Sequence, residues 1–166
     1  MKDGEDIEYY SGGEIYSRIN YLDGKLNGEY ISYFIGGDIF YKCTYLDDKR
    51  NGEYISYYES GDISYRCTYL DDDKNGEEIS YFKSGVISSK INYLDGKILG
   101  ESIIYFISGT ISSKCNYIDS NLHGECISYF KSGEILSKSY YINGNEITEL
   151  EWISYNRNIK LGLLGL

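Results

Sequence analysis

Two stretches of the sequence decide the fold: residues 21–34 read YLDGKLNGEYISYF, and residues 45–58 read YLDDKRNGEYISYY. They start 24 residues apart, and the same period relates many other positions along the chain. One glycine column comprises Gly13, Gly37, Gly61, Gly85, Gly109 and Gly133, and one tyrosine column comprises Tyr21, Tyr45, Tyr69, Tyr93, Tyr117 and Tyr141. So strict a period indicates that each unit is one supersecondary element that buries its apolar face against its neighbours.

Each unit contains two runs in which apolar and polar side chains alternate, which is the pattern of a β-strand. A serine and a glycine separate Tyr58 from Asp62, which predicts a three-residue hairpin with a type I turn and Gly61 at its positive-φ position. A loop of about five residues between Leu70 and Gly76 is expected to close the other hairpin. The predicted fold is therefore all-β, an elongated meander of about twelve or thirteen antiparallel strands in a single twisted sheet.

The alternation also assigns side chains to faces of the sheet. One face is expected to carry Ile63, Cys67, Tyr69, Ile79 and Tyr81 with their equivalents. The other is expected to carry the basic column, Arg18, Lys42, Arg66, Lys90, Lys114 and Lys138. Both faces would then hold some apolar material, to unequal extents.

The repeat pattern divides the chain into three parts. Residues 1–12 are interpreted as a partial repeat, since Gly4 and Glu5 match Gly28 and Glu29; a longer parent array or a shifted reading frame would explain it. Residues 13–142 are predicted to be tandem β-hairpin repeats, and residues 143–166 an irregular repeat that caps the array. Trp152, the only tryptophan, falls in this predicted cap.

Charge narrows the class of partner. The chain has 16 basic and 26 acidic residues, a formal charge of −10, which opposes the phosphate contacts of nucleic acids and docking on anionic lipid. A basic protein is the electrostatically favoured partner. The start MKDGEDIEYY has no apolar core of a signal peptide, and no apolar run approaches membrane-spanning length. These features predict an intracellular, cytoplasmic protein, in the host cytoplasm if the source is a virus.

The columns resemble the MORN repeats, in particular the variant class with a unit near 24 residues that is found in bacteria and large DNA viruses. The lines at residues 21–34 and 45–58 carry the resemblance, which extends over about nine tenths of the chain. It implies an elongated β-hairpin array that acts as a scaffold in protein contacts, for some members at membranes or phosphoinositides. Bacterial proteins built from such variant repeats include antitoxins or immunity partners of secreted toxins, and the resemblance therefore also offers this role.

Catalysis needs an asymmetric group of residues, whereas nearly every polar residue here recurs with the repeat. His123 is the lone histidine and could serve a hydrolase as general base, but its position favours a solvated loop residue. Cys43, Cys67 and Cys115 occupy the same strand position in different repeats, and equivalent strands of successive repeats lie about 9.6 Å apart, which is too far for a disulfide. Cys126 lies in the other strand. We therefore expect reduced structural thiols, no metal, no cofactor and no enzymatic activity.

Aspartates gather in one set of loops, and the densest cluster is Asp71, Asp72 and Asp73. They are expected to form an acidic ridge that meets a basic partner. A calcium site is not expected there, because calcium ligands must converge on one point. The glutamates beside the second glycine of each unit, Glu29, Glu53, Glu77, Glu101 and Glu125, are expected to accept hydrogen bonds from turn N–H groups. Tyrosine columns are expected to pack across strands, and to suit a protein partner where exposed.

The leading hypothesis is a non-enzymatic scaffold for protein–protein interaction; the alternatives are an antitoxin that masks a basic toxin and a membrane-associated phosphoinositide-binding scaffold. End-to-end self-association through the edge strands is a further possibility. The candidate partner-binding residues are Asp47, Asp48, Asp71, Asp72, Asp73, Tyr33, Tyr57, Tyr81, Tyr105 and Tyr129.

Overall fold

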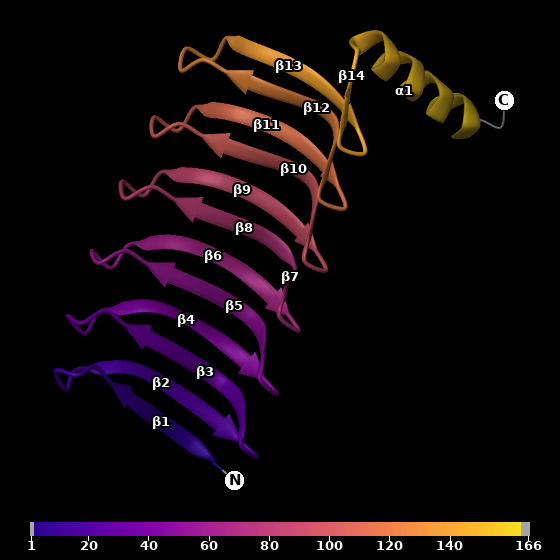
Figure 1. The fold of residues 1–166 in the computed structure, drawn as a ribbon. Helices are drawn as coiled ribbons and strands as arrows, with labels where there is room; N and C mark the ends of the chain where they lie inside the picture. Colours follow the sequence, from indigo (N-terminus) through magenta and orange to yellow (C-terminus); the bar gives the residue numbers. More distant parts are fainter. Residues whose placement is uncertain (1, 164–166) are drawn as a thin grey trace.

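A computed structural model describes residues 2–163, which form one open antiparallel sheet followed by one helix (Figure 1). Residues 164–166, part of the predicted cap, lie outside the described residues. The first strands are β1 Gly4–Tyr9, β2 Ile15–Leu22, β3 Lys25–Tyr33, β4 Ile39–Leu46, β5 Lys49–Tyr57, β6 Ile63–Leu70 and β7 Asp73–Lys74. The others are β8 Gly76–Tyr81, β9 Ile87–Leu94, β10 Lys97–Tyr105, β11 Ile111–Ile118, β12 Asn121–Tyr129, β13 Ile135–Ile142 and β14 Asn145–Ile147.

Neighbours in the sheet are neighbours in the sequence, as a meander requires. The strand order runs from β1 to β14, with the short β7 pairing only with β6, beside β8. This confirms the predicted fold class, an all-β single antiparallel sheet. The described chain places no second layer over most of the sheet, so each hairpin is held by its two neighbours.

The turns between units have the predicted geometry. Tyr58 N–H donates to the carbonyl of Asp62 at 2.8 Å, and Gly61 N–H donates to the carbonyl of Tyr58 at 2.9 Å. Gly61 has φ +86°, the left-handed position for which glycine is selected. Tyr57 pairs with Ile63, as expected, although a β-bulge accompanies the pair.

The turns within units are tighter than expected. Leu70 pairs with Asp73, so Asp71 and Asp72 alone make the turn, and both have positive φ (51° and 75°). Two central residues with positive φ define a type I′ turn, which selects Asp, Asn and Gly. The expected five-residue loop is thus wrong: the strands continue past the turn, and the extra residues near Gly76 form a bulge in which Asn75 N–H donates to the carbonyl of Thr68. The aspartates recur because the turn requires them.

Each type I′ turn is hydrogen-bonded to the repeat before it. Asp48 N–H donates to the carbonyl of Leu26 at 3.0 Å, and Asp72 N–H donates to that of Arg50 at 2.9 Å. The carboxylate of Asp72 returns the interaction by accepting from Arg50 N at 3.1 Å and Nε at 2.9 Å. Equivalent backbone bonds start at Gly24, Gly96, Ser120 and Gly144. We call this series of bonds the turn ladder.

The pairing defines two faces, because cross-strand partners share a face. Lys42 lies opposite Ile31 and Ile55, and Cys43 lies opposite Tyr30 and Tyr54. We name the cation face by the column Arg18, Lys42, Arg66, Lys90, Lys114 and Lys138. We name the tyrosine face by Tyr30, Tyr41, Tyr54, Tyr65 and Tyr69. Most of the buried residues, including Ile19, Cys43 and Cys67, belong to the tyrosine face.

The predicted assignment of Ile63, Ile79 and Tyr81 to the face of Cys67 is wrong. Ile79 pairs with Arg66, which places it and Tyr81, two residues further, on the cation face. Ile63 pairs with Tyr57, whereas Tyr65 pairs with Ser56, so one extra residue is inserted between them. This bulge shifts the alternation within the strand, which a strict period of two cannot anticipate.

Tyrosine rings pack along the tyrosine face of the first repeats. Tyr41 stacks between Tyr30 and Tyr54 with ring centroids 5.5 and 5.4 Å away, and Tyr54 meets Tyr65 edge-on at 5.8 Å. Burial raises the pKa of the Tyr41 hydroxyl, and Tyr30 adds a hydrogen bond that acts in the same direction. The expected role of the tyrosines in cross-strand packing thus holds on this face.

Cys115 and Cys126 form a disulfide, with Cα atoms 4.1 Å apart, so the expectation that all thiols are reduced is wrong. The sequence argument compared cysteines at equivalent positions, whereas these two face each other across one hairpin, in β11 and β12. Cys43 and Cys67 are buried free thiols, and burial raises the pKa of Cys43 to about 11.

The last element of the described residues is the helix α1, Glu149–Leu163, in place of a further strand pair. Thr148 and Glu151 form a capping box: Thr148 N–H donates to Glu151 Oε2 at 2.8 Å, and Glu151 N–H donates to Thr148 Oγ1 at 3.3 Å. Figure 1 shows α1 at the C-terminal end of the sheet, beside β13 and β14. Trp152 belongs to this helix, as do Ile153 and Tyr155.

We expect Asp72→Asn to lower the free energy of unfolding by about 0.5–1 kcal/mol, since it removes the charge from a partly exposed rung of the turn ladder. Arg50 lowers the pKa of Asp72 below its ordinary 3.8, so this stabilisation is present above pH 3.8 and is lost as the pH falls through the lowered value. Urea unfolding at pH 7 and pH 3 measures both effects. Asp71→Asn is the matched control; an equal loss in both variants would contradict the role of Asp72.

We expect the double variant Cys115→Ser and Cys126→Ser to lose about 2–3 kcal/mol of stability in urea unfolding, because the cross-link closes a short loop in the unfolded chain. Alkylation with iodoacetamide provides a second readout. The native oxidised chain should remain unmodified, whereas mild reduction should expose Cys115 and Cys126 but leave the buried Cys43 and Cys67 unreactive. Modification of Cys115 before reduction would disprove the disulfide.

Candidate functional site

The structure separates the two groups of predicted partner-binding residues. Asp47 and Asp48 form the turn before β5, Asp71 and Asp72 form the turn after β6, and Asp73 starts the short β7. The tyrosines Tyr33, Tyr57, Tyr81, Tyr105 and Tyr129 end β3, β5, β8, β10 and β12, where each is half-buried. A nine-residue strand spans roughly 27 Å, so the aspartates and the tyrosines lie at opposite ends of the strands.

The aspartates also differ among themselves. Asp48 accepts from Leu26 N at 2.8 Å, and Asp72 accepts from Arg50, so these two carboxylates belong to the turn ladder. Asp47 lies 3.4 Å from Lys25 with its side chain 64% exposed. Asp47 and the exposed Asp71 are therefore the members of this group most available to a partner.

Glutamates that follow the second glycine of a unit form ion pairs with the basic column of the cation face. Lys114 Nζ lies 2.6 Å from Glu101, Lys138 lies 2.8 Å from Glu125, and equivalent pairs join Lys90 to Glu77 and Arg18 to Glu5. The hydrogen bond to Glu101 raises the pKa of Lys114. These glutamates were expected to accept hydrogen bonds from turn N–H groups. Glu77, Glu101 and Glu125 do not meet this expectation, because their carboxylates bind lysines of the next strand. These pairs neutralise much of the positive charge of the cation face.

A buried acid interrupts the tyrosine face in its middle. Glu78 is 6% exposed and occupies the position that Tyr30 and Tyr54 hold in earlier repeats. Its carboxylate accepts from Tyr65 Oη at 2.7 Å and pairs with Lys74. The pairing satisfies the buried charge, as a packed interior requires, which gives the cluster a structural role.

His123 was expected in a solvated loop, but it lies in the strand β12. Its Nδ1 is 3.2 Å from Asn143 Oδ1, and its ring meets those of Tyr155 and Trp152 at centroid distances of 5.8 and 6.2 Å. These contacts give His123 a role in packing α1 against the sheet. In residues 2–163, no three His, Cys, Asp or Glu side chains gather closely enough to hold a metal ion.

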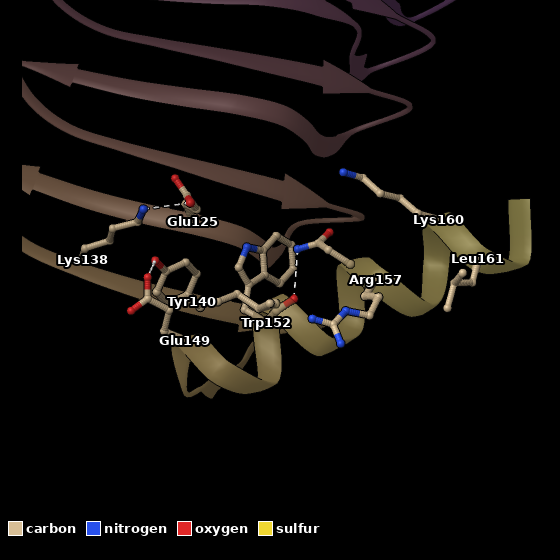
Figure 2. A pocket seen from close by; sticks show the side chains of 10 residues that line it. Glu125, Lys138, Tyr140, Glu149, Trp152, Arg157, Lys160 and Leu161 are labelled. Atoms are coloured by element: carbon tan, nitrogen blue, oxygen red, sulfur yellow. Dashed lines mark hydrogen bonds and ion pairs between the residues drawn. The ribbon is translucent and has the colours of Figure 1, made fainter. Parts of the chain in front are cut away.

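Trp152 is the centre of the contact between α1 and the cation face (Figure 2). Its ring stacks with Tyr140 at 6.2 Å and with Tyr155 at 5.7 Å. It also covers the backbone of Gly124, where a Cβ atom would lie 3.8 Å from Trp152 Cη2. Gly124 is accordingly buried, whereas Gly76 and Gly100, at the equivalent position of earlier repeats, are exposed.

Two cavities flank Trp152. The first, of about 530 Å³, lies between α1 and the sheet and is lined by Glu125, Lys138, Tyr140, Glu149, Trp152, Ile153, Asn156, Arg157, Lys160 and Leu161 (Figure 2). The second, of about 490 Å³, is lined by Leu99, Gly100, Asn116, Tyr117, Ile118, His123, Gly124, Glu125 and Trp152. We call the second one the indole-walled cavity.

Reasoning from the sequence missed both cavities, because it treated residues 143–166 as an irregular repeat. The capping-box sequence Thr148 to Glu151 was the signal that could have located the helix. No helix in the described part of the chain has the length and apolar character to cross a membrane.

A family model described as the MORN repeat variant matches residues 50–71, 74–95 and 122–143. No curated protein sequence matches the chain. Among solved structures, "Crystal structure of GtfA/B complex bound to UDP and GlcNAc" contains a chain with 14% identity and a TM-score of 0.27; the match covers 67% of this chain and 24% of that one. This likeness is too low to carry an argument about fold or function.

The family match confirms the resemblance drawn from the sequence. Each matched stretch ends at the first positive-φ residue of a type I′ turn, which is Asp71, Asp95 or Asn143, and the stretches share the hairpin geometry of the whole array. Three repeats of the array therefore match the MORN repeat variant, and MORN repeats generally mediate interactions with proteins or membranes.

Proposed function

We propose that the chain is a non-enzymatic scaffold that binds another protein along its cation face. The observation that carries this proposal is a column of half-exposed aliphatic side chains in register on that face. It consists of Leu22, Leu46, Leu70, Leu94 and Ile118, with 55%, 50%, 51%, 50% and 44% of each residue exposed. Successive members lie two strand spacings apart, roughly 10 Å, and so offer regularly repeated apolar contacts.

The charge of the chain favours a basic partner. The formal charge is −10, and each member of the aliphatic column is followed directly by an exposed turn residue: Asp23, Asp47, Asp71, Asp95 or Asp119. Apolar contacts flanked by carboxylates suit a partner with apolar side chains and surrounding Lys or Arg residues. We therefore assign the partner-binding role to Asp47 and Asp71 ahead of the tyrosines at the other end of the strands.

The membrane-scaffold alternative has less support. Binding of anionic lipid needs free positive charge, whereas Arg18, Lys90, Lys114 and Lys138 are paired with glutamates. A protein partner can use the aliphatic column without separating these pairs. A basic toxin is one partner that the acidic edge would suit.

We expect the variant Asp47→Asn with Asp71→Asn to bind a basic partner about 3–10-fold more weakly at low salt, because two exposed carboxylates are removed while Asn retains the positive-φ turn. The test captures proteins of the source cells on the immobilised chain and measures the dissociation constant of a purified captured protein at 50 and 500 mM NaCl. The wild type should lose affinity at high salt, and the variant should lose less.

The matched control is Glu14→Gln with Glu134→Gln, the same change of charge at exposed positions on the opposite edge. This control should bind like the wild type. Equal weakening by both variants would show an effect of net charge alone, and no weakening by either would contradict the proposed role of the acidic edge.

A further inference from the structure

We propose that the indole-walled cavity receives an aromatic side chain from a basic helix of the protein partner, and that this helix lies beside α1. The inference rests on the proposed protein-binding function and adds the position and chemistry of the anchor. The cavity is open on the cation face, and Trp152 forms one of its walls.

The intramolecular docking of α1 shows how this face accepts a helix. Trp152, in the first turn of α1, lies on the backbone of Gly124 and stacks on Tyr140. We call a position where the backbone of such a repeat glycine forms the base for an aromatic side chain a glycine-floored site. The missing Cβ of Gly124 lets the indole approach the backbone of the sheet. An aromatic side chain on a helix is thus a ligand that the repeat already binds.

The repeat supplies the same arrangement one unit earlier. Gly100 pairs with Tyr117, as Gly124 pairs with Tyr141. Gly100 is exposed, with no atom within 4 Å of the position of a Cβ. Leu99 replaces His123 at the neighbouring position, so this second glycine-floored site has a more apolar rim than the one that Trp152 covers.

The rim of the cavity favours an aromatic ring. Leu99 is 40% exposed and Ile118 is 44% exposed, and both line the cavity. The opposite wall is the Trp152 indole, whose ring already belongs to the series Tyr140, Trp152 and Tyr155. A further ring in the cavity would extend this series and bury the two aliphatic side chains.

Charge selects a basic helix from another protein. Asp119, whose side chain is 68% exposed beside Lys97, follows Ile118, and Asp95 occupies the equivalent turn one repeat earlier. Lys or Arg residues next to the aromatic anchor would therefore be attracted to this edge. A second copy of this chain would bring a further charge of −10, which opposes self-association at the same site.

The experiment uses a peptide that reproduces α1. The probe is residues 148–163 with Glu149→Lys, which makes the helix basic and leaves the cap formed by Thr148 and Glu151 intact. The control peptide carries Trp152→Ala in addition. Titration into the ¹⁵N-labelled full chain should shift the amide signals of Leu99, Gly100 and Ile118, and the control peptide should bind at least about tenfold more weakly. Absence of these shifts at millimolar peptide, or equal shifts with both peptides, would overturn the proposal.

Variants of the chain provide a second test. Ile118→Asp should abolish the shifts, whereas Ile107→Asp, the same change at an exposed isoleucine in the turn between β10 and β11, should leave them unchanged. Sedimentation equilibrium without peptide tests whether a second copy of the chain occupies the cavity instead. A dimer that Ile118→Asp disrupts would assign the cavity to that second copy and overturn the proposal. If Ile118→Asp leaves the affinity for the captured basic partner unchanged while Asp47→Asn with Asp71→Asn weakens it, the scaffold function stands and this inference fails.

Discussion

The turn ladder is the interaction on which the rest of the array depends. A single-layered sheet lacks an opposing layer that could hold its hairpins in register, so each repeat must be fixed to the one before it. The second residue of each type I′ turn does this by donating its N–H to the preceding repeat, and Asp48 and Asp72 add a carboxylate acceptor. The same positive-φ geometry that forms the turn points this N–H along the array. The residue chosen at this turn position, Asp, Gly or Ser, thereby ties each repeat to the one before it, in addition to the pairing of the strands.

The two faces divide the remaining tasks. The tyrosine face provides what core the molecule has, with stacked rings in the first repeats and the Cys115–Cys126 disulfide further along. The cation face holds ion pairs between lysines and glutamates and leaves the aliphatic column half-exposed. A face that is ordered by charge pairs and still offers apolar side chains at a fixed spacing is suited to binding rather than to burial.

The helix α1 breaks the symmetry of the array. Gly28, Gly52, Gly76, Gly100 and Gly124 are equivalent positions, but among them an aromatic side chain of the helix covers Gly124. Trp152 fills the site at Gly124 and becomes a wall of the cavity at Gly100. The C-terminal end of the cation face thereby gains a hollow with an aromatic wall. A repetitive surface thus acquires one distinct site.

The sequence by itself determined the repeat, the two strands per unit, the meander and the type I turn with Gly61, because alternation and glycine position are local properties of the chain. It also identified aspartates as special, but not why, since the positive φ of Asp71 and Asp72 depends on strand pairing that continues past the loop. Only the tertiary structure decided the faces, because one inserted residue between Ile63 and Tyr65 shifts the alternation. It alone also placed Cys115 opposite Cys126 and Trp152 on Gly124, since both contacts depend on which strands and helix meet in space rather than on spacing along the chain.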